Sequence, residues 1–72
     1  MERYLNLSGI SPITYYQIED DRITVWFEGA LRTYTYSYRK AGRRHVEAMK
    51  KLARSGAGLS TYISRNVRKL YD

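Results

Sequence analysis

Two neighbouring segments of the chain alternate strictly between apolar and polar positions. In residues 23–27, Ile, Val and Phe occupy every second position, and in residues 32–38 three tyrosines alternate with Thr and Ser. Successive side chains of a β-strand point to opposite faces of the sheet, so both segments are expected to be strands with one buried face. The glycine at position 29 lies between them and favours a hairpin. The chain is therefore predicted to contain an antiparallel sheet that another element covers on one side.

The position of the turn predicts which residues of these two strands lie opposite each other. A tight turn centred on residues 29–30 pairs Val25 with Tyr34 and Ile23 with Tyr36. These four side chains would then share one apolar face of the sheet.

A further strand is predicted before this hairpin. Residues 13–18 are rich in β-branched and aromatic residues and end at an acidic four-residue turn. Antiparallel pairing across that turn adds Ile18 and Tyr16 to the same apolar face. It also places Tyr15 and Trp26 side by side on the opposite face, away from the main core.

After Gly42 the apolar period changes from that of a strand to that of a helix. From Gly42 to about Arg54 the residues on the predicted apolar face are His45, Val46, Met49, Leu52 and Ala53. The glycine-rich stretch 55–58 ends this helix. A second helix is expected with Ser60 as its N-cap, and its apolar stripe consists of Leu59, Ile63, Val67 and Leu70.

This order of elements predicts an α+β fold, with a three-stranded antiparallel sheet followed by two helices packed on one face (β-β-β-α-α). A chain of 72 residues has room for one domain, so residues 1–72 are expected to fold together. The expected core consists of Ile18, Ile23, Val25, Phe27, Tyr34, Tyr36, Val46, Met49, Leu52, Ile63, Val67 and Leu70.

The charge of the chain favours an anionic partner. Thirteen Lys and Arg against seven Asp and Glu give a formal net charge of +6, and the sequence pI is about 9.8. Most of the acidic residues precede Gly29 and most of the basic ones follow it, which directs positive charge to the helical half. The bases predicted on the outward sides of the two helices are Arg43, Arg44, Lys50, Lys51, Arg54, Arg65, Arg68 and Lys69.

These bases have two interpretations. In the first, they only keep the helix surfaces hydrated and the protein in solution. In the second, they contact the phosphates of a polyanion, which supplies affinity but reads little of the nucleotide sequence. The uncovered sheet face offers a second kind of contact, because unpaired bases could stack there on Tyr15 and Trp26. Arg32 is expected at the edge of that face, within reach of a phosphate.

Four short segments also carry a family resemblance: Ser8-Gly9-Ile10-Ser11-Pro12-Ile13-Thr14-Tyr15, then Ile23-Thr24-Val25-Trp26-Phe27, then Tyr34-Thr35-Tyr36, and Gly58-Leu59 with Tyr62-Ile63 and Val67. In these segments, spread over residues 8–71, the chain resembles the KTSC family. These small domains are named after the C-terminal extension of some lysyl-tRNA synthetases and also occur as free-standing bacterial proteins. The resemblance implies no catalytic residue, and the synthetase context suggests RNA binding.

The sequence does not predict an enzyme. Without cysteine there is no thiol nucleophile and no cysteine metal site, and the one histidine, His45, is expected to be a packed, hydrogen-bonded residue. The adjacent acids 19–21 lack the spaced ligands of a calcium loop, and no Lys-Ser/Thr follows the glycines 56–58 as in a nucleotide-binding loop. We therefore expect no catalytic residue, no metal and no cofactor.

Three functions remain open at this point. The first is a nucleic-acid-binding module, with RNA as the expected partner. The second is a protein-interaction or homo-oligomerisation adaptor that uses the exposed sheet face. The third is a three-stranded reader of DNA in the major groove. No apolar segment approaches the ~20 residues needed to cross a bilayer, so a cytoplasmic protein without membrane contact is expected.

Overall fold

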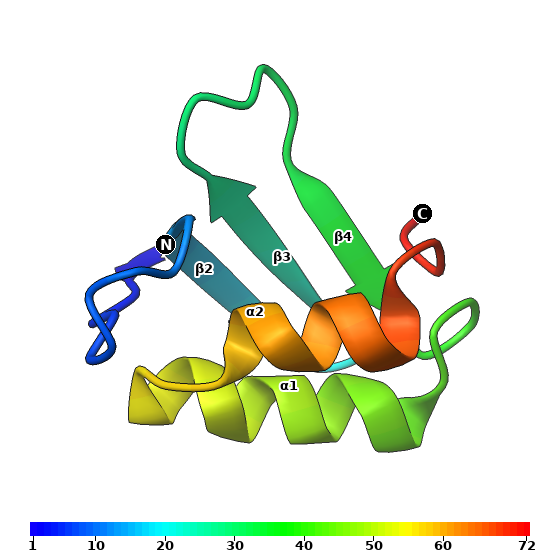
Figure 1. The fold of residues 1–72 in the computed structure, drawn as a ribbon. Helices are drawn as coiled ribbons and strands as arrows, with labels where there is room; N and C mark the ends of the chain where they lie inside the picture. The colour runs from blue at the N-terminus through cyan, green and yellow to red at the C-terminus, as the bar shows by residue number, and fades with distance from the viewer.

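An antiparallel sheet of four strands carries two helices on one face (Figure 1). The computed structural model describes residues 1–72. Across the sheet the strands are β1 (Glu2–Arg3), β2 (Ile13–Glu19), β3 (Arg22–Phe27) and β4 (Tyr34–Ser37). The helices are α1 (Arg43–Ser55) and α2 (Leu59–Tyr62), and α2 continues as the π-helical turn η1 (Ile63–Val67). The predicted α+β class is confirmed.

The sheet has one strand more than the three predicted. β1 pairs antiparallel with β2 and places Arg3 opposite Tyr15. A strand of only two residues has no alternation that a sequence pattern can reveal. Its effect on the fold comes from the next residue, because Tyr4 donates its backbone N–H to the carbonyl of Thr14 at 2.9 Å and is buried.

The register of the central hairpin is the predicted one. Val25 lies opposite Tyr34, and Ile23 lies opposite Tyr36. All four residues face the helices, and Ile23 and Val25 are fully buried. The alternation of apolar residues therefore predicted the register correctly, because a slip by one residue would have exposed these side chains to solvent.

The connection between β3 and β4 is wider than the tight turn predicted. The pairing of β3 with β4 ends at Val25 and Tyr34, and the hydrogen bond from Ala30 N–H to the Phe27 carbonyl, at 3.2 Å, closes only the first half of the loop. As a result β4 spans Tyr34–Ser37 rather than residues 32–38, and Leu31 is completely exposed.

A β-bulge at Thr14 changes which way the start of β2 faces. Ile13 lies opposite Phe27 and Tyr15 lies opposite Trp26, so Thr14 has no partner across the ladder. Its hydroxyl donates instead to the Trp26 carbonyl at 3.2 Å. The extra residue shifts the inward–outward alternation of side chains along β2, so that the Ile13 side chain points into the core.

The helix ends agree with the predicted break but not with every predicted cap. α1 begins after Gly42 and ends at Gly56, whose φ of 78° is the left-handed conformation that glycine adopts at helix C-termini. The backbone N–H of Gly56 bonds back to the carbonyls of Ala53 and Leu52. The prediction that Ser60 is the N-cap of α2 is wrong, because the helix starts two residues earlier, with Gly58 as its cap.

The prediction that Leu70 belongs to the core is wrong. The apolar stripe of the second helix ends before Leu70, which is 36% exposed. The helical hydrogen bonding changes to the π type over η1 and stops at Val67, so Leu70 lies in the following turn. Tyr71 packs instead, with its ring centroid 4.8 Å from that of Tyr34 in an edge-to-face arrangement.

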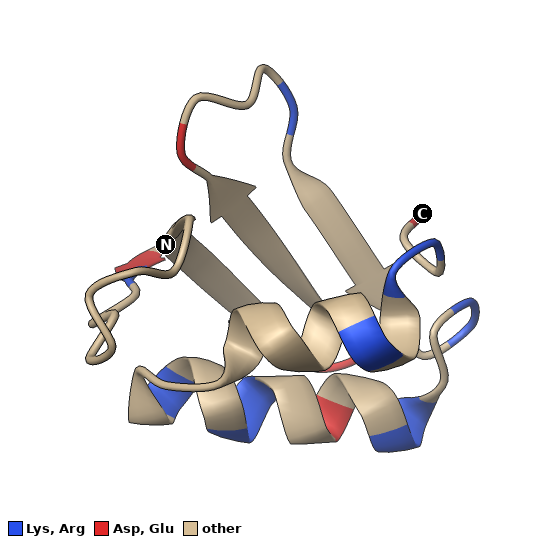
Figure 2. Cartoon of the chain, in the orientation of Figure 1, with Lys and Arg blue, Asp and Glu red and all other residues tan.

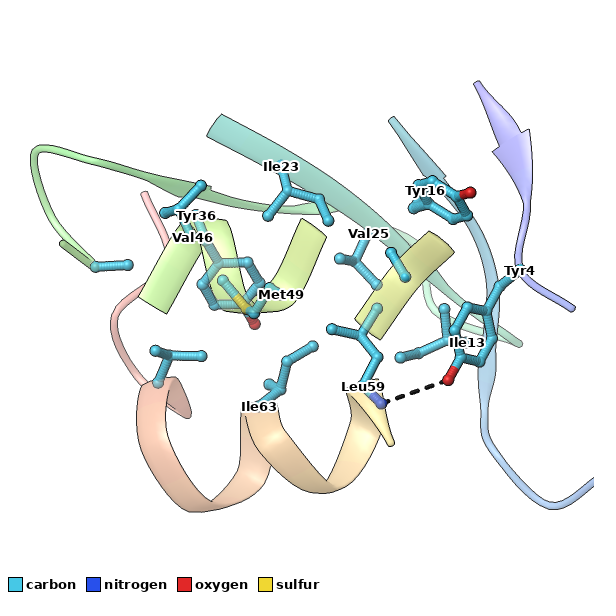
Figure 3. Packing of buried hydrophobic residues seen from close by; sticks show 13 residues of the cluster. Tyr4, Ile13, Tyr16, Ile23, Val25, Tyr36, Val46, Met49, Leu59 and Ile63 are labelled. Carbon is cyan, nitrogen blue, oxygen red and sulfur yellow. Dashed lines mark hydrogen bonds between the residues drawn. The ribbon is translucent and has the colours of Figure 1, made fainter. Parts of the chain in front are cut away.

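The core lies between the sheet and the two helices (Figure 3). The predicted core residues that are buried are Ile23, Val25, Tyr36, Val46, Met49, Ile63 and Val67. Those that are only partly buried at its margin are Ile18, Phe27, Tyr34 and Leu52. Buried residues outside the predicted set are Tyr4, Ile13, Tyr16, Ala41, Ala53 and Leu59. Figure 3 shows how the N-terminal segment joins this core, since the Leu59 N–H donates to the Tyr4 hydroxyl at 3.4 Å.

Truncation of a central residue tests this packing. Ile23→Ala removes buried methyl groups from a side chain with no exposed surface and is expected to lower the free energy of unfolding by about 2–5 kcal/mol. Leu31→Ala, at the exposed tip of the loop, should change it by less than about 0.5 kcal/mol. Urea denaturation of both variants measures the difference, and equal effects would contradict the observed facing of β3.

Candidate nucleic-acid interface

Three cations form a row on the outward side of α1. Arg44, Lys51 and Arg54 are exposed and follow one another at helical spacing, opposite the buried Val46 and Met49. With a rise of about 1.5 Å per residue the row extends over about 15 Å. Figure 2 shows basic positions along this helix and on the neighbouring helical segment. We call Arg44, Lys51 and Arg54 the α1 basic row.

The α1 basic row has no acidic partner. The ion pairs in the structure join Arg22 to Asp21 and Lys50 to Glu47. Glu47 is the one acid on α1, and Lys50 already neutralises it at 2.8 Å. The charge of the row is therefore uncompensated and available to an anion.

Lys50 does not belong to the predicted binding surface. This lysine is only 6% exposed. Its ammonium group donates to the Asp20 carbonyl at 2.9 Å and also pairs with Glu47. The same group lies 5.5 Å from the centre of the Tyr38 ring. This lysine thus ties α1 to the turn between β2 and β3, because its long stem runs along the helix edge toward the sheet.

The hydrogen bonds around Glu47 shift two pKa values in opposite directions. Donation from Lys50 and from the Tyr38 hydroxyl lowers the pKa of Glu47 below its usual value. The hydrogen bond to the Glu47 carboxylate raises the pKa of Tyr38, because it favours the protonated phenol. At neutral pH the carboxylate is charged and the phenol is neutral.

A groove of about 430 Å³ opens between the ends of β3 and β4 and the segment α2–η1. Its aromatic walls are Phe27, Tyr34, Tyr36 and Tyr71, and we call it the aromatic groove. Edge-to-face contacts hold the rings in place, with centroids 5.4 Å apart between Phe27 and Tyr34 and 6.4 Å apart between Tyr36 and Tyr71. Burial raises the pKa of Tyr36 to about 12, so its hydroxyl stays protonated at physiological pH.

Arg32 lies beside the aromatic groove and not, as predicted, at the edge of the face that carries Trp26. Its guanidinium group is 5.1 Å from the centre of the Tyr34 ring and 5.2 Å from that of Tyr71. Residue 32 lies in the bend that precedes β4 and is not part of the paired strand. Two cation–π contacts then hold the side chain on the helix side of the sheet.

The remaining predicted cations are distributed over both regions. Arg68 and Lys69 are exposed and line the aromatic groove. Arg65 is exposed on η1 outside the groove. Arg43 lies at the start of α1, with its guanidinium group 5.7 Å from the centre of the Tyr38 ring. The predicted basic surface is thus divided between the α1 basic row and the rim of the groove.

Tyr15 and Trp26 are neighbours on the outer face of the sheet, as predicted. Tyr15 is 40% exposed, whereas Trp26 is partly buried. Arg3, which is exposed, stands opposite Tyr15 on β1. The neighbouring row is neutral, and the hydroxyls of Thr24 and Thr35 hydrogen-bond to each other there at 3.0 Å.

His45 has the structural role predicted for it. Its Nδ1 is 2.7 Å from the Tyr62 hydroxyl, and the side chain is partly buried between α1 and α2. No group of three or more His, Cys, Asp and Glu residues in residues 1–72 is arranged to hold a metal ion.

Sequence reasoning missed the aromatic groove. The alternation in β4 predicts that its tyrosines are core residues, and no pattern in the sequence assigns a role to Tyr71. The available signal was the excess of aromatic residues over what a small core needs, with eight tyrosines in 72 residues.

Comparisons with models of protein families, with curated proteins and with solved structures find no match to this chain. Function is therefore inferred from the surfaces themselves. No helix has the length and apolar composition that would let it pass through a bilayer.

Two adjacent lysines test the division between structural and exposed cations. Lys50→Met removes the donor to the Asp20 carbonyl and the partner of Glu47, and is expected to lower the free energy of unfolding by about 1–3 kcal/mol. Lys51→Met, on the exposed side, should change it by less than about 0.5 kcal/mol. Thermal or urea unfolding measures both. Equal stability of the two variants would contradict the structural role of Lys50.

The lowered pKa of Glu47 predicts a pH dependence of stability. The native carboxylate stays charged at a pH where the unfolded one is already protonated, so its stabilising effect is complete above the unfolded pKa. It is lost as pH falls through the lower, native pKa. The stability difference between the wild type and Glu47→Gln should therefore shrink between about pH 6 and about pH 3. Glu28→Gln, in the exposed loop, is the control, and a difference at Glu47 that does not change with pH would contradict the expectation.

Proposed function

We propose that this chain is a small, non-catalytic RNA-binding module that contacts the phosphate backbone through the α1 basic row. The observation that carries the proposal is the row itself: three exposed cations on one helix face, without an acidic partner, in a chain of net charge +6. Cations that replace condensed counterions along a phosphate backbone provide the main part of such affinity.

Two further features favour single-stranded RNA over duplex DNA. Partly exposed aromatic rings occur in the aromatic groove and on the outer sheet face, and proteins that bind unpaired nucleotides stack bases on such rings. A sheet that enters the major groove of DNA needs cations along its outer face, whereas the middle of this face is neutral at Gln17 and Thr24 and its cations, Arg3 and Arg22, lie at the margins. The resemblance to domains attached to a tRNA synthetase supports the same choice.

Salt dependence tests the phosphate contacts. For single strands the logarithm of the binding constant falls with the logarithm of salt concentration by about 0.7 per phosphate contact. Lys51→Gln and Arg44→Gln are each expected to weaken binding to a single-stranded RNA oligomer and to reduce that slope by about one contact. Arg22→Gln removes the same charge at the start of β3, outside the α1 basic row, and should leave the slope unchanged. Fluorescence anisotropy with labelled RNA at several salt concentrations measures all four proteins.

Two results would overturn the proposal. One is the absence of RNA binding at low salt. The other is an equal loss of slope in Arg22→Gln and Lys51→Gln, which would mean that only net charge matters and that α1 has no specific part. Duplex DNA that binds more tightly than single-stranded RNA would instead favour a DNA reader.

Trp26 reports on the outer sheet face, since it is the only tryptophan. If bases stack on Tyr15 and Trp26, single-stranded RNA should quench the Trp26 emission in a saturable and salt-dependent manner. Trp26→Ala should then lose about 1–3 kcal/mol of binding free energy per stacked base. Unfolding measurements on the same variant separate lost binding from lost stability. An emission that RNA leaves unchanged would restrict the RNA to the helix side of the sheet.

A protein-interaction adaptor is the second candidate function, and one observation favours it. Leu5, Leu7 and Ile10, in the segment between β1 and β2, are 64%, 69% and 89% exposed. Leu5 and Leu7 lie over Gly56 at the end of α1, so they form a fixed apolar surface. Molecular mass measured by sedimentation over a range of protein concentrations tests whether copies of the chain associate there, and Leu7→Gln should abolish such association.

A further inference from the structure

The aromatic groove combines an apolar floor with a polar rim. Its floor contains Ile63 and Tyr36, which are buried, and its walls contain Tyr34 and Tyr71, which are partly exposed. A volume of about 430 Å³ lies within the range of about 300–1,000 Å³ that is usual for sites of small ligands. Because the loop between β3 and β4 is open and η1 ends at Val67, neither element closes the groove.

The hydroxyl groups in the groove have no partner within the protein. Elsewhere the hydroxyls of Tyr4, Tyr38 and Tyr62 are each hydrogen-bonded. Tyr36 is only 2% exposed, yet its hydroxyl makes no hydrogen bond, although every fully buried polar side-chain atom in the structure has a partner. The Tyr36 oxygen is therefore open to the groove that the residue lines, and is free to bond to a ligand.

Other hydroxyls join it around the same space. Ser60 and Ser64 line the groove from α2 and η1, one helical turn apart, and the hydroxyls of Tyr34 and Tyr71 are likewise unpartnered. A purely apolar ligand would leave these groups without hydrogen bonds, at a cost for each one that is buried. The groove thus fits a flat ligand whose edge carries several donors and acceptors.

The charge at the rim of the groove is positive. Arg68 and Lys69 are exposed there, and Arg32 is held against the Tyr34 and Tyr71 rings. The nearby acid, Asp72, is already engaged at the edge of β4, where its carboxylate accepts from the Ser37 hydroxyl at 2.8 Å. The ligand is therefore expected to carry an anionic group beside its flat part.

We propose that the aromatic groove binds one unpaired nucleotide of the RNA, with the base against the aromatic walls and the phosphate at Arg68 and Lys69. A nucleotide has each of the features that the groove requires: a π-face, an edge of donors and acceptors, and a phosphate. This inference rests on the proposed RNA-binding function, and it adds a site that accepts a base only when the base is unpaired.

Adenosine 5′-monophosphate is the probe, because it reaches the groove without any contact to the α1 basic row. Its addition is expected to shift the backbone amide NMR signals of β4, of residues 60–64 and of residues 68–71, and to leave those of residues 44–54 unchanged. Inorganic phosphate at the same concentration should cause no comparable shift, because it lacks the base. Equal shifts with both compounds would show a simple anion site and overturn the proposal.

Variants of exposed residues, and one variant of the buried Tyr36 that keeps its ring, test the groove. Ser64→Leu fills the groove and is expected to weaken binding of the mononucleotide at least tenfold, whereas Thr61→Leu, exposed on α2 outside the groove, should not. Arg68→Gln should weaken it several-fold, with Arg65→Gln as the matched control. Tyr36→Phe removes only the hydroxyl and should also weaken binding. Its thermal unfolding verifies that the core is intact.

The same set of variants separates this inference from the proposed function. RNA that binds wild type and Ser64→Leu equally well, with no mononucleotide binding, would overturn the groove as a nucleotide site and leave the α1 basic row standing. Mononucleotide binding without RNA binding would overturn the proposed function instead. Both proposals require that Ser64→Leu and Lys51→Gln each weaken RNA binding, and that only Ser64→Leu weakens binding of the mononucleotide.

Discussion

The packing of α1 across one face of the sheet is the interaction on which the rest of this structure depends. A sheet with one apolar face is unstable in water until another element covers it, and here Val46 and Met49 bury themselves completely against the side of the sheet that carries Ile23 and Val25. Lys50 adds a polar tie from the same helix to the β2–β3 turn. Once the helix is held in this orientation, its outward side is determined by the 3.6-residue period, and the α1 basic row must face solvent. The packing that forms the core thus also determines where the cations that we propose for RNA binding are placed.

The aromatic groove is a consequence of where the covering helices end. α1 and the segment α2–η1 lie side by side on the sheet, but η1 stops at Val67. The chain then returns along β4, where the backbone N–H of Asp72 donates to the Thr35 carbonyl at 2.8 Å, and Tyr71 meets Tyr34 edge to face. Aromatic side chains that a longer helix would have covered remain partly open. A π-helical turn borders this site, and such turns are frequent at functional sites because they displace side chains from the regular helical positions.

The central part of the fold could be predicted from the sequence. Ile23 and Val25 alternate with polar residues, so only one orientation of β3 buries both side chains.

The parts that could not be predicted have physical reasons. β1 is too short to show a pattern, and the bulge at Thr14 reverses the alternation at Ile13. Lys50 looked like one more exposed lysine, and its burial depends on a carbonyl 30 residues away. The groove escaped prediction for the same reason, since Tyr34, Ser64 and Arg68 come together only through tertiary packing. The exposed row on α1 was accessible to sequence reasoning because helical spacing alone defines it.

The two surfaces would contribute different properties to RNA binding. Phosphate contacts by Arg44, Lys51 and Arg54 provide affinity that any polyanion could satisfy, and they weaken as salt screens them. Stacking in the groove provides about 1–3 kcal/mol per base, requires that the base be unpaired, and depends less on salt. A chain whose largest extent is 31 Å cannot bind a long segment, so a basic row alone would distinguish poorly between single strands and duplexes. One captured base would change that preference by about 5- to 150-fold, because a duplex would first have to give up a base pair to occupy the groove.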